Sequence, residues 1–119
     1  MFDSPIEFIL AQHIINHPLI IRNGIRVQSQ VPLGPFRVDL MLFNYYGYPL
    51  CIIECDGRAY HWRDNQRSRD NGRAREIERW TRLRIIRFTG SQINRNANKC
   101  VEEILRFLQF GVKPIRRWG

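Results

Sequence analysis

The sequence predicts one small α/β (α+β) domain with a mixed β-sheet of about four strands flanked by helices, in the order α-β-β-β-α-β-α. Two observations predict this class. Of the 119 residues, 44% are hydrophobic, which suits a single core. Three strand-like segments also precede a helical segment and a further strand, and a hairpin followed by a helical crossover mixes antiparallel with parallel pairing.

The first helix is predicted from Ser4 to about Asn16. Ser4 is a suitable N-cap, Pro5 suits the first helical position, and Glu7 completes a capping-box pattern. The helix is expected to end before His17-Pro18, and its inward stripe is expected to contain Ile6, Ile9, Leu10, His13 and Ile14.

Three strands are expected next. Residues 25–31 alternate weakly, residues 32–35 (PLGP) read as a turn, and residues 36–43 (FRVDLMLF) form a second strand whose apolar run is interrupted by Asp39. A loop over residues 44–49 then joins this strand to a third at residues 50–55, so that the two form a hairpin.

The second half is predicted to hold a helix over residues 63–82, a strand over 83–88 and an amphipathic helix over 97–110. Trp80 falls at helical spacing with Ile77, which predicts a core position, and Asn71-Gly72 weakens the first half of this helix. We expect the domain to span residues 1–110, followed by a basic tail at 111–119.

The charge distribution predicts a polyanionic partner. The formal net charge is +8, and 17 of the 19 basic residues are arginine, whose planar fork grips phosphate in a bidentate manner. Ten arginines against four acids between Arg58 and Arg87 give that segment a net charge of +6. A merely soluble basic protein is the alternative, and the concentration of charge favours nucleic acid.

Cysteine number and hydropathy indicate a cytoplasmic protein. Three cysteines in no zinc-ligand spacing are expected to be free thiols, and neither a signal peptide nor a membrane-spanning run is evident.

The most informative stretch is residues 52–61, IIECDGRAYH. An apolar strand ends in two acids, Glu54 and Asp56, which lie on one face because strand side chains alternate. Burying an unpaired carboxylate is costly, and a divalent cation removes that cost. With Gly57 and then His61, the pattern suits metal-assisted hydrolysis. A turn at Asp56-Gly57 explains one of the acids without function.

Asp39, the E-x-D-G-x-x-x-H signature at residues 54–61 and the RIIRF strand resemble the PD-(D/E)XK nuclease superfamily, more narrowly its very-short-patch repair (Vsr)-like branch, which includes EDxHD-type homing endonucleases. The resemblance covers residues 4–108 and implies a restriction-endonuclease-like core in a bacterial or phage-encoded protein. Asp56 occupies the position of the usual catalytic lysine, and the zinc ligands of the repair enzyme have no counterpart here.

The resemblance implies a Mg²⁺ site, with Mn²⁺ as a substitute, at Asp39 with Asp56 or Glu54 and the backbone carbonyl of Cys55. His61 is the expected general acid or base, since histidine titrates near neutrality. Glu7 on the first helix is either a further acid of this site or only a capping residue.

Residues after the acids are expected to hold nucleic acid. Five arginines are placed to bind phosphate, and two aromatic residues beside His61 either stack on bases or belong to the core. The final acid of the EDxHD pattern falls on Asp64 or Asp70, and charge balance within an arginine-rich helix is the favoured explanation for both. The expected nucleic-acid-binding residues are Arg58, Tyr60, Trp62, Arg63, Arg67, Arg69 and Arg73.

Two functions from different classes follow. The first is a metal-dependent DNA endonuclease of nicking, homing or repair type, acting on double-stranded DNA as a homodimer or with an additional DNA-binding domain or chain. The second is a non-catalytic nucleic-acid-binding module that retains the nuclease fold. Only the resemblance favours DNA over RNA.

Overall fold

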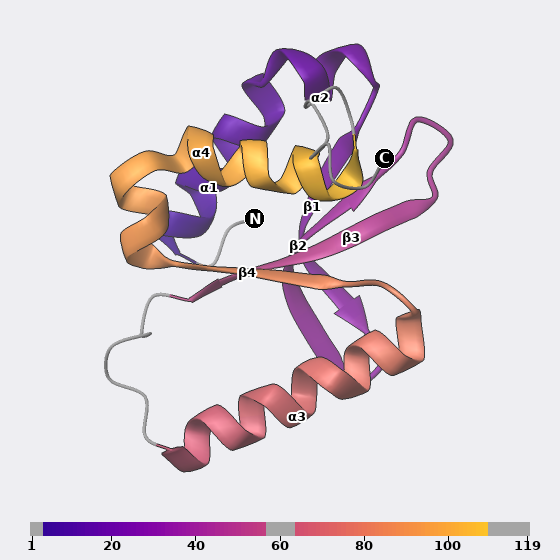
Figure 1. Cartoon of the computed structure of the whole chain (residues 1–119). Helices are drawn as coiled ribbons and strands as arrows, with labels where there is room; N and C mark the ends of the chain where they lie inside the picture. The colour runs from indigo at the N-terminus through magenta and orange to yellow at the C-terminus, as the bar shows by residue number, and fades with distance from the viewer. Residues whose placement is uncertain (1–3, 57–63, 110–119) are drawn as a thin grey trace, which may run out of the picture.

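A computed structural model describes residues 4–56 and 64–109, and for residues 64–71 it describes the backbone alone. Three layers are visible in Figure 1, with α1, α2 and α4 on one face of the sheet and α3 on the other. The described part contains four helices and four strands: α1 Pro5–Asn16, α2 Pro18–Arg22, β1 Arg26–Leu33, β2 Phe36–Phe43, β3 Pro49–Asp56, α3 Asp64–Thr81, β4 Ile85–Thr89 and α4 Gly90–Leu108. The predicted order is confirmed, with the short α2 added between His17 and Asn23.

The sheet order is β1-β2-β3-β4. The first three strands are antiparallel, and β4 pairs in parallel with β3 after the crossover through α3. The mixed sheet predicted from the hairpin and crossover is therefore present. The parallel β3–β4 ladder runs from Ile52 opposite Ile85 to Asp56 opposite Thr89, so β4 pairs with β3 as far as the last residue of β3.

Two hydrophobic cores hold the layers together. The larger lies between the sheet and the α1–α4 pair and includes Leu10, Ile14, Leu40 and Ile104, all fully buried. The smaller lies under α3 and consists of Val38, Met41, Ile52 and Ile77. Because β2 and β3 contribute to both cores, their ends are held from both faces.

Two side chains predicted to face the core are exposed. His13 lies at the surface, with its ring Nδ1 2.9 Å from the carbonyl oxygen of Ile9. Trp80 is 59% exposed, because Ile77 already fills the contact with the sheet and Trp80 reaches past it to the β1–β2 turn. There its ring covers Gly34, where a Cβ would come within 2.9 Å of the indole.

The last helix begins seven residues before the predicted start at Ala97. Thr89 caps it through a capping box with Gln92, in which each side chain accepts the backbone N–H of the other residue. The backbone is non-helical at Asn96, which kinks the helix. The first half of the helix is polar, so the hydrophobic periodicity that predicts a helix is evident only in the second half.

Three further expectations have clear outcomes. The helix over residues 64–81 is continuous through Asn71-Gly72. Pro32 and Leu33 belong to β1, which shortens the expected turn to Gly34-Pro35. All three cysteines are free thiols, and among the residues the structure describes no helix is both long and apolar enough to cross a membrane.

Candidate active site

The strands β2 and β3 separate at Asp39 and Glu54. Their backbone pairing extends to Leu40 opposite Ile53 and stops there. Beyond that pair, the Asp39 N–H donates to Glu54 Oε2 at 3.0 Å, and the Cys55 N–H donates to Asp39 Oδ2 at 2.8 Å. In place of ladder hydrogen bonds, each of the two carboxylates thus accepts a backbone N–H of the opposite strand.

A shift in side-chain alternation causes this separation. Along β2, Leu40 packs in the larger core and Met41 in the smaller, as alternation requires, yet Val38 also packs in the smaller core. Opposite Asp39, Gln30 has φ 51° and the two residues form no ladder pair. A non-glycine residue in this region is strained, and such strain gathers at functional sites.

Glu54 is 8% exposed and both its oxygens have donors. Besides the Asp39 N–H on Oε2, Oε1 accepts Nη1 of Arg73 at 2.5 Å. The second nitrogen of this guanidinium, Nη2, donates to the carbonyl oxygen of Arg37 at 2.7 Å, and the guanidinium carbon lies 5.8 Å from the centre of the Phe36 ring. Arg73 therefore joins α3 to β2 and β3 at the site.

Glu7 brings α1 to the same place. Its backbone N–H donates to Ser4 Oγ at 3.3 Å, which is the cap predicted from the sequence, while its side chain, 1% exposed, accepts Gln30 Nε2 at 2.8 Å. Glu7 thus shows a feature of each alternative left open by the sequence, the helix cap and the acid beside the site. The capping function belongs to its backbone, and the carboxylate belongs to the acidic cluster of Glu7, Asp39 and Glu54.

The electrostatics show how closely these acids gather. The pKa of Asp39 is raised to about 6: burial is the largest cause and the charges of Glu54 and Glu7 add to it, while hydrogen bonds from the Cys55 backbone and the Gln30 side chain oppose the rise. Burial, followed by the charges of Asp39, Glu7 and Glu54, also raises the pKa of the Cys55 thiol. The site is a region of negative potential that favours a bound cation or proton.

Asp56 lies two residues beyond Glu54, at the last β3–β4 pair, and is half-buried. Strand alternation places it on the same face as Glu54. Cys55 between them is half-buried and packs against the larger core. The carboxylates of Glu54 and Asp56 therefore both lie at the end of β3, where β2 has separated from it.

The remaining predicted site residues lie outside what the structure describes. These are His61, Arg58, Tyr60, Trp62 and Arg63 in the segment 57–63, and the side chains of Arg67 and Arg69 in the first half of α3. Of the predicted nucleic-acid-binding residues, Arg73 has a described side chain, and its guanidinium is engaged with Glu54.

Gln30 is a site residue that sequence analysis missed. It lies in a strand that alternates only weakly in sequence, and its partner Glu7 is 23 positions away. Its position opposite Asp39 follows from the β1–β2 register, which is a tertiary property.

The donor chemistry of the site suits a hard divalent cation, because carboxylate oxygens are the ligands such ions prefer. Within residues 4–56 and 64–109, however, no group of three or more His, Cys, Asp or Glu side chains is arranged to hold a metal ion. Glu54 in particular is already neutralised by Arg73. In this arrangement Asp39, whose raised pKa a cation would lower, is the residue best suited to bind one.

A mixed four-stranded sheet between helical layers, with buried acids where two central strands separate, defines a fold of the restriction-endonuclease-like class. The chain matches the family model REase_MTES_1575 over residues 12–108 and belongs to this restriction-endonuclease-like family. The match supports the PD-(D/E)XK-type superfamily expected from the motif, and it includes Asp39, Glu54 and Asp56. No curated protein matches the chain.

Proposed function

We propose that this protein is a metal-dependent DNA endonuclease that hydrolyses phosphodiester bonds. The single observation that carries the proposal is the pair Asp39 and Glu54, two acids held by reciprocal bonds where β2 and β3 separate. The family supports nuclease activity and DNA as the substrate. The high arginine content suits the same substrate, since phosphate contacts supply much of the affinity for nucleic acid.

Asp39 is the proposed principal ligand of Mg²⁺ or Mn²⁺, and Asp56 and the backbone carbonyl of Cys55 would be its further ligands. The bound cation would supply Lewis acidity at the scissile phosphate and a more acidic water. Glu54 is the weaker candidate ligand, because Arg73 and the Asp39 N–H occupy its oxygens. Glu54 would then act by positioning Asp39.

His61 is proposed to move the proton. Water adds to phosphorus, the bond to the leaving oxygen breaks, and one proton passes from the attacking water while another reaches the leaving oxygen. Arginines after the acids would neutralise the charge that develops on the phosphate. The spacing of residues 54–61 supports a Vsr-like endonuclease of nicking, homing or repair type, assisted by a second copy or an additional DNA-binding domain.

The test is the conversion of supercoiled plasmid to nicked or linear DNA in Mg²⁺, Mn²⁺ or EDTA. We expect metal-dependent cleavage that is lost in Asp39→Asn and His61→Ala and retained in Glu102→Gln, a matched control on the exposed face of α4. Intact plasmid under every metal, or cleavage retained by Asp39→Asn, would overturn the proposal.

A second candidate is a nucleic-acid-binding module without catalysis. Two observations favour it: Glu54 is paired with an arginine rather than available to a metal, and the described residues contain no three-ligand group. In the same experiment it predicts a salt-sensitive shift of DNA with no strand cleavage, whereas an endonuclease cuts.

A further inference from the structure

The loop between β2 and β3 exposes three tyrosines on one turn. Tyr45, Tyr46 and Tyr48 are 63%, 80% and 68% exposed. Single exposed apolar side chains are ordinary on a protein surface, but a cluster of aromatic rings commonly marks a contact site. We call residues 44–48 the tyrosine loop.

Hydrogen bonds hold the tyrosine loop in one conformation. Asn44 Oδ1 accepts the backbone N–H groups of Tyr46 and Tyr48, both at 2.9 Å. The Asn44 N–H donates to the carbonyl oxygen of Tyr48 at 2.8 Å, and the Gly47 N–H donates to that of Asn44 at 3.0 Å. Rings on such a fixed backbone lose little entropy on binding, so the loop is preorganised.

The three rings have different surroundings. Tyr45 leans on Gly24, where a Cβ would lie 3.0 Å from the ring, and it meets the Tyr46 ring edge to face with centroids 5.3 Å apart. Tyr45 therefore supports the loop. Tyr46 and Tyr48 are more exposed than Tyr45 and are the rings available for contact.

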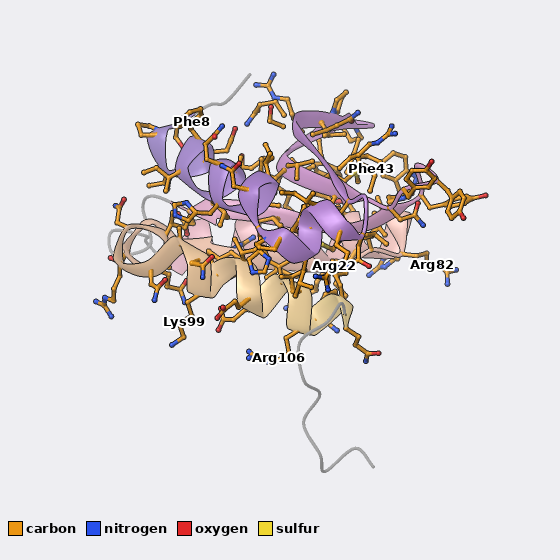
Figure 2. The ribbon with its side chains drawn as sticks, turned by 90° about the horizontal axis from the view of Figure 1, so that it is seen from above. Phe8, Arg22, Phe43, Arg82, Lys99 and Arg106 are labelled. Atoms are coloured by element: carbon orange, nitrogen blue, oxygen red, sulfur yellow. The ribbon has the colours of Figure 1, made fainter. Side chains whose placement is uncertain are left out.

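The surroundings of the tyrosine loop are basic. Arg26 lies opposite Phe43, the last residue of β2, and Arg82 lies just before β4; both are exposed. Figure 2 shows Phe43, Arg22 and Arg82 toward one end of the molecule and Phe8 toward the other. The acidic cluster lies at the far end of β3, since Glu54 is five residues from Pro49.

From this arrangement we infer that the tyrosine loop is a contact surface for unpaired nucleotides, whose bases stack on Tyr46 and Tyr48 while their phosphates face Arg26 and Arg82. Rigid aromatic rings beside positive charge are the means by which proteins bind single strands. An acidic protein surface would use the arginines, but it offers no series of flat bases for Tyr46 and Tyr48 to stack on. The inference rests on the proposed function and adds the form of substrate it prefers.

The geometry also indicates where such nucleotides lie. Five residues of strand from Pro49 to Glu54 span roughly 17 Å. At about 3.4 Å per base pair of duplex, this corresponds to about five base pairs between the tyrosine loop and the acids. A substrate with a single-stranded or melted segment at that distance from the cleaved bond would contact both.

The experiment compares two oligonucleotides by fluorescence anisotropy in EDTA, which keeps the strands intact: a blunt duplex, and the same duplex with a five-nucleotide overhang containing 2-aminopurine. The full chain is compared with Tyr46→Ala/Tyr48→Ala and with the matched control Tyr46→Phe/Tyr48→Phe. We expect the alanine variant to bind the overhang substrate about tenfold more weakly and the phenylalanine variant to bind it as the wild type does. Quenching of 2-aminopurine by the wild type should be lost in the alanine variant.

Equal affinity of the wild type and the alanine variant for the overhang substrate would overturn the inference and leave the endonuclease proposal standing. Failure of the wild type to bind either oligonucleotide would overturn the inference, and plasmid cleavage in Mg²⁺ or Mn²⁺ would then decide the endonuclease proposal by itself. A change of oligomeric state in the alanine variant without nucleic acid, measured by sedimentation, would assign the loop to a second copy of the chain and overturn the inference.

Discussion

Asp39 and Glu54 are more than candidate ligands, because each carboxylate also holds the opposite strand in place. The bonds Asp39 N–H to Glu54 and Cys55 N–H to Asp39 stabilise the separation of β2 from β3. A site built in this way keeps its acids close in the absence of a cation. The cost is electrostatic and falls on Asp39, whose raised pKa reflects burial beside other acids.

The pH dependence of stability follows from that pKa. The Asp39 carboxyl group has a pKa of about 6 in the folded protein, against an ordinary value of 3.8. Its ionisation therefore lowers stability as pH rises between these two values, and stability remains lower above them. Asp39→Asn removes the charge and keeps an acceptor for the Cys55 N–H. We expect the free energy of unfolding of this variant to be roughly 1–2 kcal/mol higher than that of the wild type at pH 8 and nearly equal to it at pH 4. Urea titration in EDTA measures both values.

The same variant should lose cleavage, so stability and activity move in opposite directions. Glu102→Gln, at an exposed position, should shift neither curve. A variant of Asp39 that is less stable than wild type at pH 8 would contradict this account.

The Arg73–Glu54 pair makes a second prediction at the residue scale. Removing the guanidinium leaves Glu54, 8% exposed, with an unpaired charge, which we expect to cost about 2–3 kcal/mol of unfolding free energy in Arg73→Ala. Arg79→Ala on the exposed face of the same helix is the matched control, with a change below about 0.5 kcal/mol. Urea unfolding measures both.

A double-mutant cycle separates charge from packing. Arg73→Met with Glu54→Gln removes both charges, and we expect it to recover most of the stability lost in Arg73→Ala. If Arg73→Ala behaves like Arg79→Ala, the ion pair contributes nothing to holding α3 against the sheet.

At the scale of elements, α4 begins where β4 ends and next to the site. Thr89 is the last residue of β4, the N-cap of α4 and the ladder partner of Asp56. The capping box therefore fixes the helix start and the end of the strand beside the acids. This is why a helix with a polar first half forms here despite its kink at Asn96.

Thr89→Ala removes the side chain that accepts the Gln92 N–H. We expect a loss of about 1 kcal/mol and a fall in Tm of roughly 4 °C by differential scanning calorimetry. Ser91→Ala, two residues into the helix, serves as the control and should leave Tm nearly unchanged. Equal melting of the two variants would show that the cap adds nothing to the stability of α4.

At the scale of the whole molecule, charge is distributed unevenly. Buried Glu7 and Glu54 lie with half-buried Asp39 where β2 and β3 separate, while a net charge of +8 is carried mostly by arginines elsewhere. The basic surface attracts a polyanion, whereas the acids repel its phosphates, and the proposed cation would offset that repulsion. In the proposed function, DNA binding would therefore depend on salt and cleavage on the metal ion.

The affinity for DNA should therefore fall steeply with salt. With about four phosphate contacts, we expect roughly a 100-fold loss between 50 and 200 mM NaCl, measured by anisotropy with a duplex in EDTA. An affinity independent of salt would mean that the arginines do not contact the phosphates.

The sequence alone was sufficient for the order of the main helices and strands, though not for α2 or for the start of α4. The capped first helix, the strand at residues 36–43 and the acids at the end of β3 depend on local patterns, in which alternation and capping act over a few residues. Local patterns failed where packing overrides them. Trp80 has helical core spacing, but its ring lies exposed against Gly34 in the β1–β2 turn, while Ile77 fills the contact with the sheet.

Tertiary structure decided which groups meet at the site. The bonds of Asp39 with Glu54 and Cys55, of Arg73 with Glu54 and of Gln30 with Glu7 join residues 15, 16, 19 and 23 positions apart. Such contacts depend on strand register and on the face each helix turns inward, which composition and spacing leave open. The sequence thus determined that acids stand at a strand end in a basic protein. The fold decided that Arg73 neutralises Glu54 and that Asp39 carries the electrostatic cost, because only packing sets burial and distance between charges.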